Sequence, residues 1–309
     1  MGKPLLTDDI IEKAKRGELR DEDLYGEDFQ PDDGIPHIYK SRRIEQEKRK
    51  AFRRKLNVIL GIVLLLIAAL VYAVFYLWGK MKIGIIAAME QELRLLVDRL
   101  EDTKTTIHLG NTYYSGKLGK HDVVLVQSGV GKVMSAMSVA VLVDDFEVEA
   151  VINTGSAGAV AEGIAIGDVV VASRLVYHDV DLTAFGYAYG QMSMQPLYFE
   201  SDERFVAVFE ETLREQKVAS HIGLIATGNS FIAGQDKIDR IKTAFPEVLA
   251  VEMEGAAIAQ AAHATNCPFI VIRAMSDTAS HDANITFDEF IIEAGKRSAK
   301  TLITFLEKL

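Results

Sequence analysis

The sequence is poor in the residues on which several kinds of chemistry depend. It has one cysteine, Cys267, so no disulfide can form within the chain. The seven histidines are scattered and show no metal-binding spacing. Cys267 lies in an apolar run beside Pro268, which favours a buried structural thiol over a nucleophile. The sequence therefore predicts an activity that uses neither a bound metal nor a reactive thiol.

Basic residues are also in short supply, with 34 Lys and Arg against 44 Asp and Glu. The imbalance is uneven, because residues 1–35 have a net charge of −6 and residues 36–56 a net charge of +7. The remaining chain has 20 basic and 31 acidic residues. Phosphate backbones are bound by clustered Lys and Arg, so this acidic part argues against a nucleic-acid partner.

Residues 1–56 form a polar tail, acidic and then basic, without a sustained apolar period. We expect residues 1–35 to be disordered or weakly helical, with one short helix over Thr7 to Glu18. Thr7 could cap that helix or accept a phosphate, and capping is the simpler interpretation.

One long uncharged run, Val58 to Trp78, predicts a transmembrane helix over residues 57–79. Its 21 residues would span roughly 30 Å as a helix, which matches the hydrocarbon core of a bilayer. Tyr72, Tyr76 and Trp78 gather at one end, as an interfacial aromatic belt would. A buried core helix or a cleaved signal peptide fits less well, because the run lacks polar residues, lies deep in the chain and has no small-residue cleavage site.

The flanking charges predict an orientation. Eight Lys and Arg between residues 42 and 55 precede the run, whereas Lys80 and Lys82 follow it closely. The positive-inside rule then places the N-terminus in the cytoplasm and residue 81 onward outside.

From residue 81 the pattern changes to short apolar runs that alternate with amphipathic stretches. The expected strands are Lys82–Ala87, Asp122–Gln127, Ala150–Asn153, Asp168–Ala172, Gly223–Thr227 and Phe269–Arg273. The expected helices are Gln91–Leu100, Lys132–Asp144, Asp202–Glu215, Asp236–Ala244, Met253–Thr265 and Phe287–Leu306. This alternation predicts a three-layer α/β domain with a largely parallel or mixed sheet.

Ligands of such sheets bind beyond the carboxyl ends of the strands, where this sequence places small residues, glycines and carboxylates. Glu90 and Glu92 open a helix, and by themselves they could simply complement its dipole. The glycines of Gly129-Val130-Gly131-Lys132 lack the spacing of a phosphate-binding loop and favour a tight strand-to-helix turn.

Three further carboxylates lie in apolar surroundings. Glu252 and Glu254 each need a partner if buried, which could be a structural ion pair or the hydroxyls of a ligand. Asp277 could cap a turn, or it could act as an acid with a raised pKa. Carboxylates at several strand ends, without metal or thiol, suit glycosidic cleavage by one acid and one base.

Residues 81–309 resemble the bacterial 5′-methylthioadenosine/S-adenosylhomocysteine nucleosidases throughout. The resemblance is carried, in this order, by Met81–Glu92 (MKIGIIAAMEQE), Ser128–Lys132 (SGVGK), Asn153–Gly158 (NTGSAG), Tyr177–Asp179 (YHD), Thr183–Tyr187 (TAFGY), Val251–Glu254 (VEME) and Arg273–Asp277 (RAMSD). It implies the purine nucleoside phosphorylase-like fold, a homodimer, no cofactor, and hydrolysis of adenine thionucleosides to adenine and a thioribose sugar.

The same resemblance implies a role for individual residues. Asp277 would protonate adenine N7, and Glu92 would activate the water. Glu254 would bind the ribose hydroxyls, with Met253 beneath the sugar. The remaining implied site residues are Ser276 in support of Asp277, Arg273 behind the residues that contact the substrate, Phe231, Ile232 and Ala233 at the base, Ser156, Ala157 and Phe287 in the pocket, and Leu182 and Phe185 reaching the partner subunit's alkylthio pocket.

The sequence departs from the family at Gln191–Met194, where a proline-glycine pair is expected, so the alkylthio preference is open. A nucleoside phosphorylase is an alternative, but Glu90 and Glu92 would repel the phosphate that it must bind. A membrane regulator of cell-wall synthesis that merely binds nucleosides is a second alternative.

The N-terminal 80 residues resemble a different family, the streptococcal cell-wall synthase accessory phosphoproteins (MacP), which implies a penicillin-binding protein as partner. Met1–Asp8 (MGKPLLTD) and Ile38–Glu45 (IYKSRRIE) carry this resemblance, together with the single membrane run. The orientation rule would export an enzyme whose substrates arise in the cytoplasm. The enzyme could act outside, the orientation could be inverted, or the enzyme could also be made alone from Met81. We favour the last of these, or a fusion of neighbouring genes.

Overall fold

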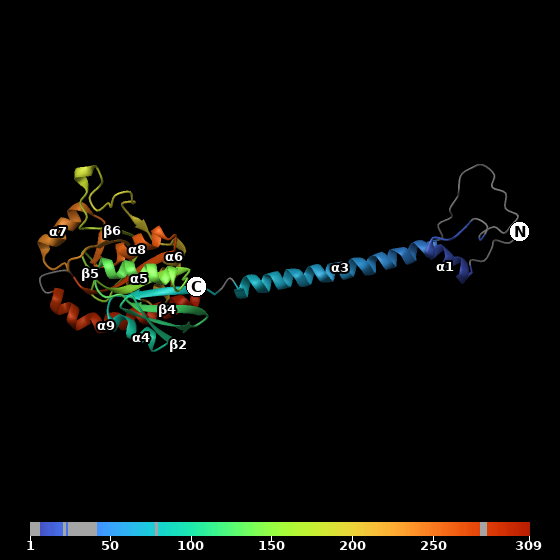
Figure 1. Cartoon of the computed structure of the whole chain (residues 1–309), viewed down its shortest axis with the longest axis horizontal. Helices are drawn as coiled ribbons and strands as arrows, with labels where there is room; N and C mark the ends of the chain where they lie inside the picture. The colour runs from blue at the N-terminus through green and yellow to red at the C-terminus, as the bar shows by residue number, and fades with distance from the viewer. Residues whose placement is uncertain (1–6, 21–22, 24–41, 78–79, 279–282) are drawn as a thin grey trace. The chain divides into compact units, whose positions relative to one another are not determined.

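A computed structural model describes most of the chain, and its parts fall into two units, Met1–Phe75 and Tyr76–Leu309. The described residues are 7–20, 23, 42–77, 80–278 and 283–309 (Figure 1). Side chains at 42–48, 51, 73–77, 91–92 and 283–294 lie outside that description. Most of the tail expected to be disordered falls outside the described residues, as does Trp78.

The first unit begins with the short helix that the sequence predicts, α1 (Asp8–Arg16). Gly17 ends it with a φ of 75°, and the Gly17 N–H donates to the carbonyl oxygen of Ala14. Thr7 occupies the N-cap position but forms no side-chain capping hydrogen bond, so the expected cap is wrong. No residue of α1 is buried, which leaves the helix without a core of its own.

The helix α3 (Arg42–Leu77) is 36 residues long and begins within the basic stretch. Its segment Phe52–Tyr72 is 21 residues long and contains an 18-residue window with a mean hydropathy of 2.4, none of which is buried. By length and composition this segment could cross a membrane. The helix as a whole would measure about 54 Å, so it extends well beyond a hydrocarbon core of about 30 Å.

The second unit alternates strands and helices, as the sequence predicts. Its described elements in chain order are β1 (Lys82–Ala87), α4 (Glu90–Val97), β2 (Glu101–His108), β3 (Asn111–Leu118), β4 (His121–Gln127), α5 (Lys132–Asp144), β5 (Ala150–Ala159), β6 (Val169–Tyr177), η1 (Thr183–Phe185), β7 (Phe199–Glu200), α6 (Glu203–Glu215), β8 (Ser220–Thr227), α7 (Gln235–Ala244), β9 (Val248–Glu252), α8 (Gly255–Ala264), β10 (Phe269–Asp277) and α9 (Ala283–Lys308).

The strands form one mixed sheet in the order β10-β6-β8-β9-β5-β1-β4-β3-β2, with β7 paired to β6. β1 runs parallel to β4 and β5, and β5 runs parallel to β10. Because β10 also pairs with β5, the strands β5, β9, β8, β6 and β10 close into a ring. The closure brings the carboxyl ends of several strands to one edge.

Helices cover both faces of the sheet, which makes the three layers that the sequence predicts (Figure 1). On one face, Val139 and Leu142 of α5 and Ile258 of α8 join the core with Val151 and Val271 of the sheet. The core on the other face is formed by side chains of α4, α6 and α9 with β1, β4, β5, β6 and β10. The buried strands read as continuous apolar runs for this reason.

Four strands were not predicted from the sequence, and the starts of α8 and α9 were misplaced, the latter at Phe287 instead of Ala283. β2 is largely exposed and polar, and β3 mixes polar and aromatic residues, so neither shows the expected apolar run. β7 has two residues. β9 is short, and α8 begins at Gly255 instead of Met253 because the chain stays extended through Glu252.

Candidate active site

A cavity of about 500 Å³ lies at the carboxyl ends of β1, β4, β5, β8, β9 and β10. This is the edge at which ligands of such sheets bind. Its lining residues are Ala88, Met89, Val130, Thr154, Gly155, Ser156, Ala157, Gly158, Ser230, Phe231, Ile232, Val251, Glu252, Met253, Glu254, Arg273, Ser276 and Asp277. Nine of the fourteen site residues implied by the family resemblance thus meet in one cavity, together with Glu252.

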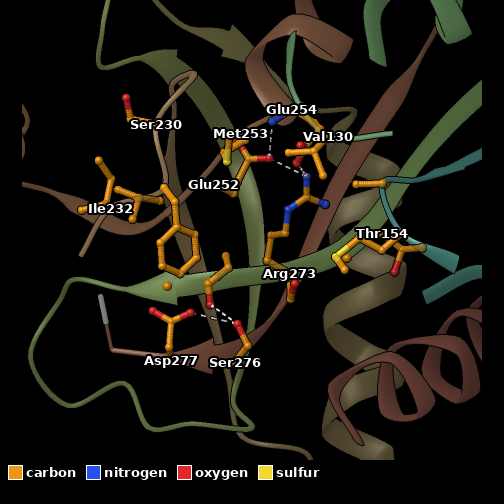
Figure 2. A pocket seen from close by; sticks show the side chains of 18 residues that line it. Val130, Thr154, Ser230, Ile232, Glu252, Met253, Glu254, Arg273, Ser276 and Asp277 are labelled. Atoms are coloured by element: carbon orange, nitrogen blue, oxygen red, sulfur yellow. Dashed lines mark hydrogen bonds and ion pairs between the residues drawn. The ribbon is translucent and has the colours of Figure 1, made fainter. Parts of the chain in front are cut away.

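Asp277 is buried at the end of β10, where the register with β5 shifts between Met275 and Asp277. Such bulges re-aim side chains. The Ser276 hydroxyl donates to Asp277 Oδ2 at 3.0 Å, and the Ala157 carbonyl oxygen is an alternative acceptor at 3.4 Å. Ser276 is 0% exposed, so the Asp277 carboxyl is held from the protein side while it lines the cavity (Figure 2).

Glu254 lines the cavity immediately before α8. The Gly131 N–H donates to Glu254 Oε1 at 2.8 Å. Gly131 has a φ of 101° and Gly129 a φ of 80°, a backbone conformation that side chains rarely adopt. The glycines after β4 therefore form the expected tight turn, and this turn aims one N–H at a cavity carboxylate.

Glu252 has a different environment, although it is two residues away and equally buried. Its Oε2 lies 2.5 Å from Arg273 Nη2 and accepts the Gly255 N–H at 2.7 Å. Its Oε1 accepts a hydrogen bond from Thr227 Oγ1. The sequence left open whether Glu252 pairs with a protein group or with the hydroxyls of a ligand. In the structure Glu252 forms an ion pair within the protein.

Arg273 connects the two glutamates to the strand beside them. Its Nη2 also donates to Asn153 Oδ1 at 2.5 Å and lies 3.8 Å from Glu254 Oε2. Figure 2 shows its side chain between the Asp277–Ser276 pair and the segment that carries Glu252 and Glu254. Asn153 and Thr227 were not singled out from the sequence, because a polar residue in an apolar strand does not reveal its partner.

The remaining cavity residues combine apolar and small side chains. Phe231 is 42% exposed at the cavity, whereas Ile232 and Ala157 are buried. Met253 and Ser156 are half-buried lining residues. This composition suits a flat apolar ring beside a hydroxyl-rich group.

Five of the expected site residues are not among the lining residues. Ala233 follows Ile232 and is half-buried. Leu182 precedes η1, and Phe185 within it is 80% exposed. Glu92 and Phe287 belong to α4 and α9, but their side chains lie outside the described residues. Among the residues that the structure describes, no group of His, Cys, Asp and Glu could hold a metal ion.

Comparison with known proteins identifies the fold and the family. Residues 82–307 match the family model described as the phosphorylase superfamily. A 5′-methylthioadenosine/S-adenosylhomocysteine nucleosidase from Aeromonas salmonicida is 46% identical over 231 residues, which are 74% of this chain and 100% of that protein. The chain belongs to this nucleosidase family. A Listeria monocytogenes nucleosidase is 45% identical over 233 residues, with the same coverage.

Solved nucleosidase structures agree with this assignment. The S-adenosylhomocysteine nucleosidase from Streptococcus pyogenes, in complex with 5-methylthiotubericidin, is 70% identical with a TM-score of 0.74. The match covers 75% of this chain and 98% of that chain. The Streptococcus pneumoniae nucleosidase with the transition-state inhibitor MT-ImmA is 68% identical with a TM-score of 0.72, over 74% and 99% of the two chains. These four nucleosidases thus match about three quarters of the chain.

The N-terminal part matches a separate family. Residues 1–77 match the model described as penicillin-binding protein 2a activator MacP. The chain therefore joins a MacP-like segment to a complete nucleosidase domain.

Proposed function

We propose that residues 81–309 hydrolyse the N-glycosidic bond of 5′-methylthioadenosine and S-adenosylhomocysteine, releasing adenine and a thioribose sugar. The supporting observation is that Asp277 and Glu254 line one cavity, each held by a hydrogen bond from a neighbour. An acid near the base and an acceptor near the sugar are what this reaction needs. The family relationship supports the same substrates.

In this proposal Asp277 gives its proton to adenine N7 as the bond between C1′ and N9 breaks. The electron pair of that bond leaves with adenine, and positive charge develops at C1′. Glu92 takes a proton from water, whose oxygen forms the new bond to C1′. Glu254 accepts hydrogen bonds from the ribose hydroxyls, and Met253 lies beneath the sugar.

The other residues bind or position the nucleoside. Phe231, Ile232 and Ala233 hold the base, while Ser156, Ala157 and Phe287 line the remaining pocket. Ser276 orients Asp277. Arg273 holds Glu252 at 2.5 Å and thereby supports the segment that carries Glu254.

We propose that the enzyme is a homodimer in which Leu182 and Phe185 of the partner subunit complete the alkylthio pocket. The supporting observation is that Phe185 is 80% exposed, which is unusual for a large aromatic side chain. Sedimentation analysis of the wild type and of Phe185→Ala tests this. A monomeric wild type would refute the homodimer, and a Phe185→Ala dimer of unchanged stability with unchanged KM would refute the role of Phe185.

Hydrolysis is favoured over phosphorolysis by the charges at the cavity. Arg273 is the cation among the described lining residues, and it is engaged by Glu252 and Asn153. A phosphate dianion beside Glu252 and Glu254 would be repelled.

The test measures adenine release from both substrates by the full-length chain in detergent, with and without phosphate. We expect release at a rate that phosphate does not change. A rate that requires phosphate would establish a phosphorylase, and no release at all would favour a regulator that merely binds nucleosides.

We further propose that residues 57–79 anchor the chain in a membrane, with a cytoplasmic N-terminal tail that contacts a penicillin-binding protein. The apolar segment of α3, the basic residues before it and the MacP match support this. Protease protection of an N-terminal tag tests the orientation.

A separately started enzyme from Met81 would place catalysis in the cytoplasm. Intact-mass analysis of the expressed protein tests for it, and the presence of the full-length chain alone would remove this proposal.

A further inference from the structure

Three chain segments meet at the carboxylate of Asp179, just beyond the end of β6. Lys132 Nζ donates to Asp179 Oδ1 at 2.7 Å and lies 3.0 Å from Oδ2. The backbone N–H of Asn229 donates to Asp179 Oδ2 at 2.8 Å. Lys132 begins α5, and Asn229 lies two residues beyond the end of β8.

Each segment joined by Asp179 carries a different wall of the cavity. The residues before Lys132 are Val130, which lines the cavity, and Gly131, whose N–H holds Glu254 at 2.8 Å. The residues after Asn229 include Phe231 and Ile232, which also line it. Asp179 is not a lining residue, yet it ties the wall near Glu254 to the wall near Phe231.

The loop after β8 is fixed where it begins. The Gly228 N–H donates to the Glu252 carbonyl oxygen at 3.1 Å, and the next N–H is the one held by Asp179. A Cβ on Gly228 would lie 2.2 Å from His178 Cε1, so the imidazole packs directly against the backbone. The backbone is therefore held at two successive residues, Gly228 and Asn229, just before the residues that line the cavity.

The ion pair between Lys132 and Asp179 is partly shielded from solvent, so it can hold the two segments at a fixed separation. The side chains of Lys132 and Asp179 are 19% and 28% exposed, and salt screens such a pair less than a fully exposed one. Lys132 Nζ also lies 5.0 Å from the ring centroid of Tyr177. Burial alone would raise the pKa of Asp179, but hydrogen bonds from Lys132 and the Asn229 N–H hold that pKa below its usual value.

We propose that Asp179 and Lys132 are positioning residues. Their ion pair sets the distance between the cavity wall at Phe231, which holds the base, and the wall at Glu254, which holds the sugar. The proposal rests on the proposed function, because it assumes that adenine lies against Phe231 and the sugar against Glu254. Loss of the pair lets the 228–234 loop move relative to the Gly131 turn. Nucleoside and adenine then bind more weakly, whereas Asp277 keeps its own support.

The test compares Asp179→Asn, Lys132→Met and the double variant with the full-length chain in detergent. We expect each single change to raise KM for methylthioadenosine on the order of fivefold to tenfold, with kcat changed much less. The double variant should show less than the product of the single effects, because neither charge is left alone. Lys132→Arg keeps the charge and should restore most of the affinity.

A matched control is the ion pair between Arg174 Nη2 and Glu247 Oε1, which are 2.6 Å apart; neither residue is among those that line the cavity. Glu247→Gln should leave KM and kcat unchanged. Thermal unfolding of every variant shows whether it is folded, and the double variant keeps the comparison possible if a single change does not fold.

Adenine affinity, measured by titration calorimetry, gives a readout that does not need turnover. Weaker adenine binding by Asp179→Asn supports the proposal even if the wild type released no adenine, in which case the proposed function alone would fail. Unchanged KM and adenine affinity in Asp179→Asn and Lys132→Met would overturn the positioning role, as would a loss confined to kcat.

Discussion

Arg273 and Glu252 form a buried ion pair in which Nη2 lies 2.5 Å from Oε2 and both side chains are 2% exposed. The same Oε2 accepts the backbone N–H groups of Glu254 and Gly255, at 3.0 Å and 2.7 Å. Glu252 thus fixes the backbone at the start of α8, and that backbone places the Glu254 side chain at the cavity. Two neighbouring carboxylates of similar burial have separate tasks.

This division predicts opposite results for two isosteric changes. Glu252→Gln should lower the free energy of unfolding by about 3–5 kcal/mol, because it removes the carboxylate charge nearest to the buried Arg273 guanidinium. Glu254→Gln should change stability little but weaken nucleoside binding. Urea unfolding and KM for methylthioadenosine measure the two effects. Equal destabilisation by both changes would contradict the assignment.

Asp277→Asn should reduce kcat by about 10²-fold or more while the protein stays folded and binds adenine. The amide can still accept the Ser276 hydroxyl, which lies 3.0 Å from Oδ2, so the loss reports the missing proton. Ser276→Ala should cost less, about tenfold, because it removes orientation alone. Single-turnover kinetics with both variants measures this. Loss of adenine binding together with kcat would show that Asp277 holds the base.

Much of the fold could be predicted from the sequence, because its buried strands are apolar runs. The bounds of β1 and α5 were predicted to the residue, and those of α6 and α7 to within one. β2 could not be predicted, since its burial pattern is almost entirely exposed. The apolar-run criterion therefore detects strands covered on both faces and misses those at a solvated edge.

The site was predicted less evenly than the fold. Asp277 and Glu254 were named from motifs and Phe231 from the family resemblance, and all three line one cavity. What the sequence could not give is which of Glu252 and Glu254 is satisfied by the protein, because that depends on Arg273, 21 residues away from Glu252. The role of Asp179 was hidden for the same reason, since its partners at 132 and 229 come from distant segments.

Gly228→Ala should impair nucleoside binding because the added Cβ has no space beside the His178 ring, and not because of backbone strain. Gly228 is not among the glycines with positive φ, but a Cβ there would meet the His178 ring at 2.2 Å from Cε1. His178 is 8% exposed and cannot swing away, so we expect the loop to shift and KM to rise about tenfold. His178→Ala should partly restore the KM of Gly228→Ala in the double variant. No rescue would show that the glycine is needed for another reason.

Acid should destabilise the nucleosidase domain through two buried histidines. Burial lowers the pKa of His121 and of His178 from the usual value of 6.5. As pH falls below about 6.5, the unfolded chain takes up protons that the folded chain does not. The stability that the two neutral histidines contribute is therefore lost as pH falls toward their folded-state pKa values. The urea midpoint of residues 81–309, the part that the nucleosidase relatives match, should therefore fall between about pH 7.5 and pH 5.5.

His121→Asn isolates one of these two groups. The Met81 N–H donates to His121 Nδ1 at 3.2 Å, and an asparagine oxygen can accept that bond without titrating in this range. Burial is the main cause that lowers the pKa of His121, and its Nε2 atom is buried without a hydrogen-bond partner. The variant should lose less stability on acidification than the wild type. His263→Asn at an exposed position is the control, and an equal pH dependence in wild type and His121→Asn would exclude His121 as a source of the acid sensitivity.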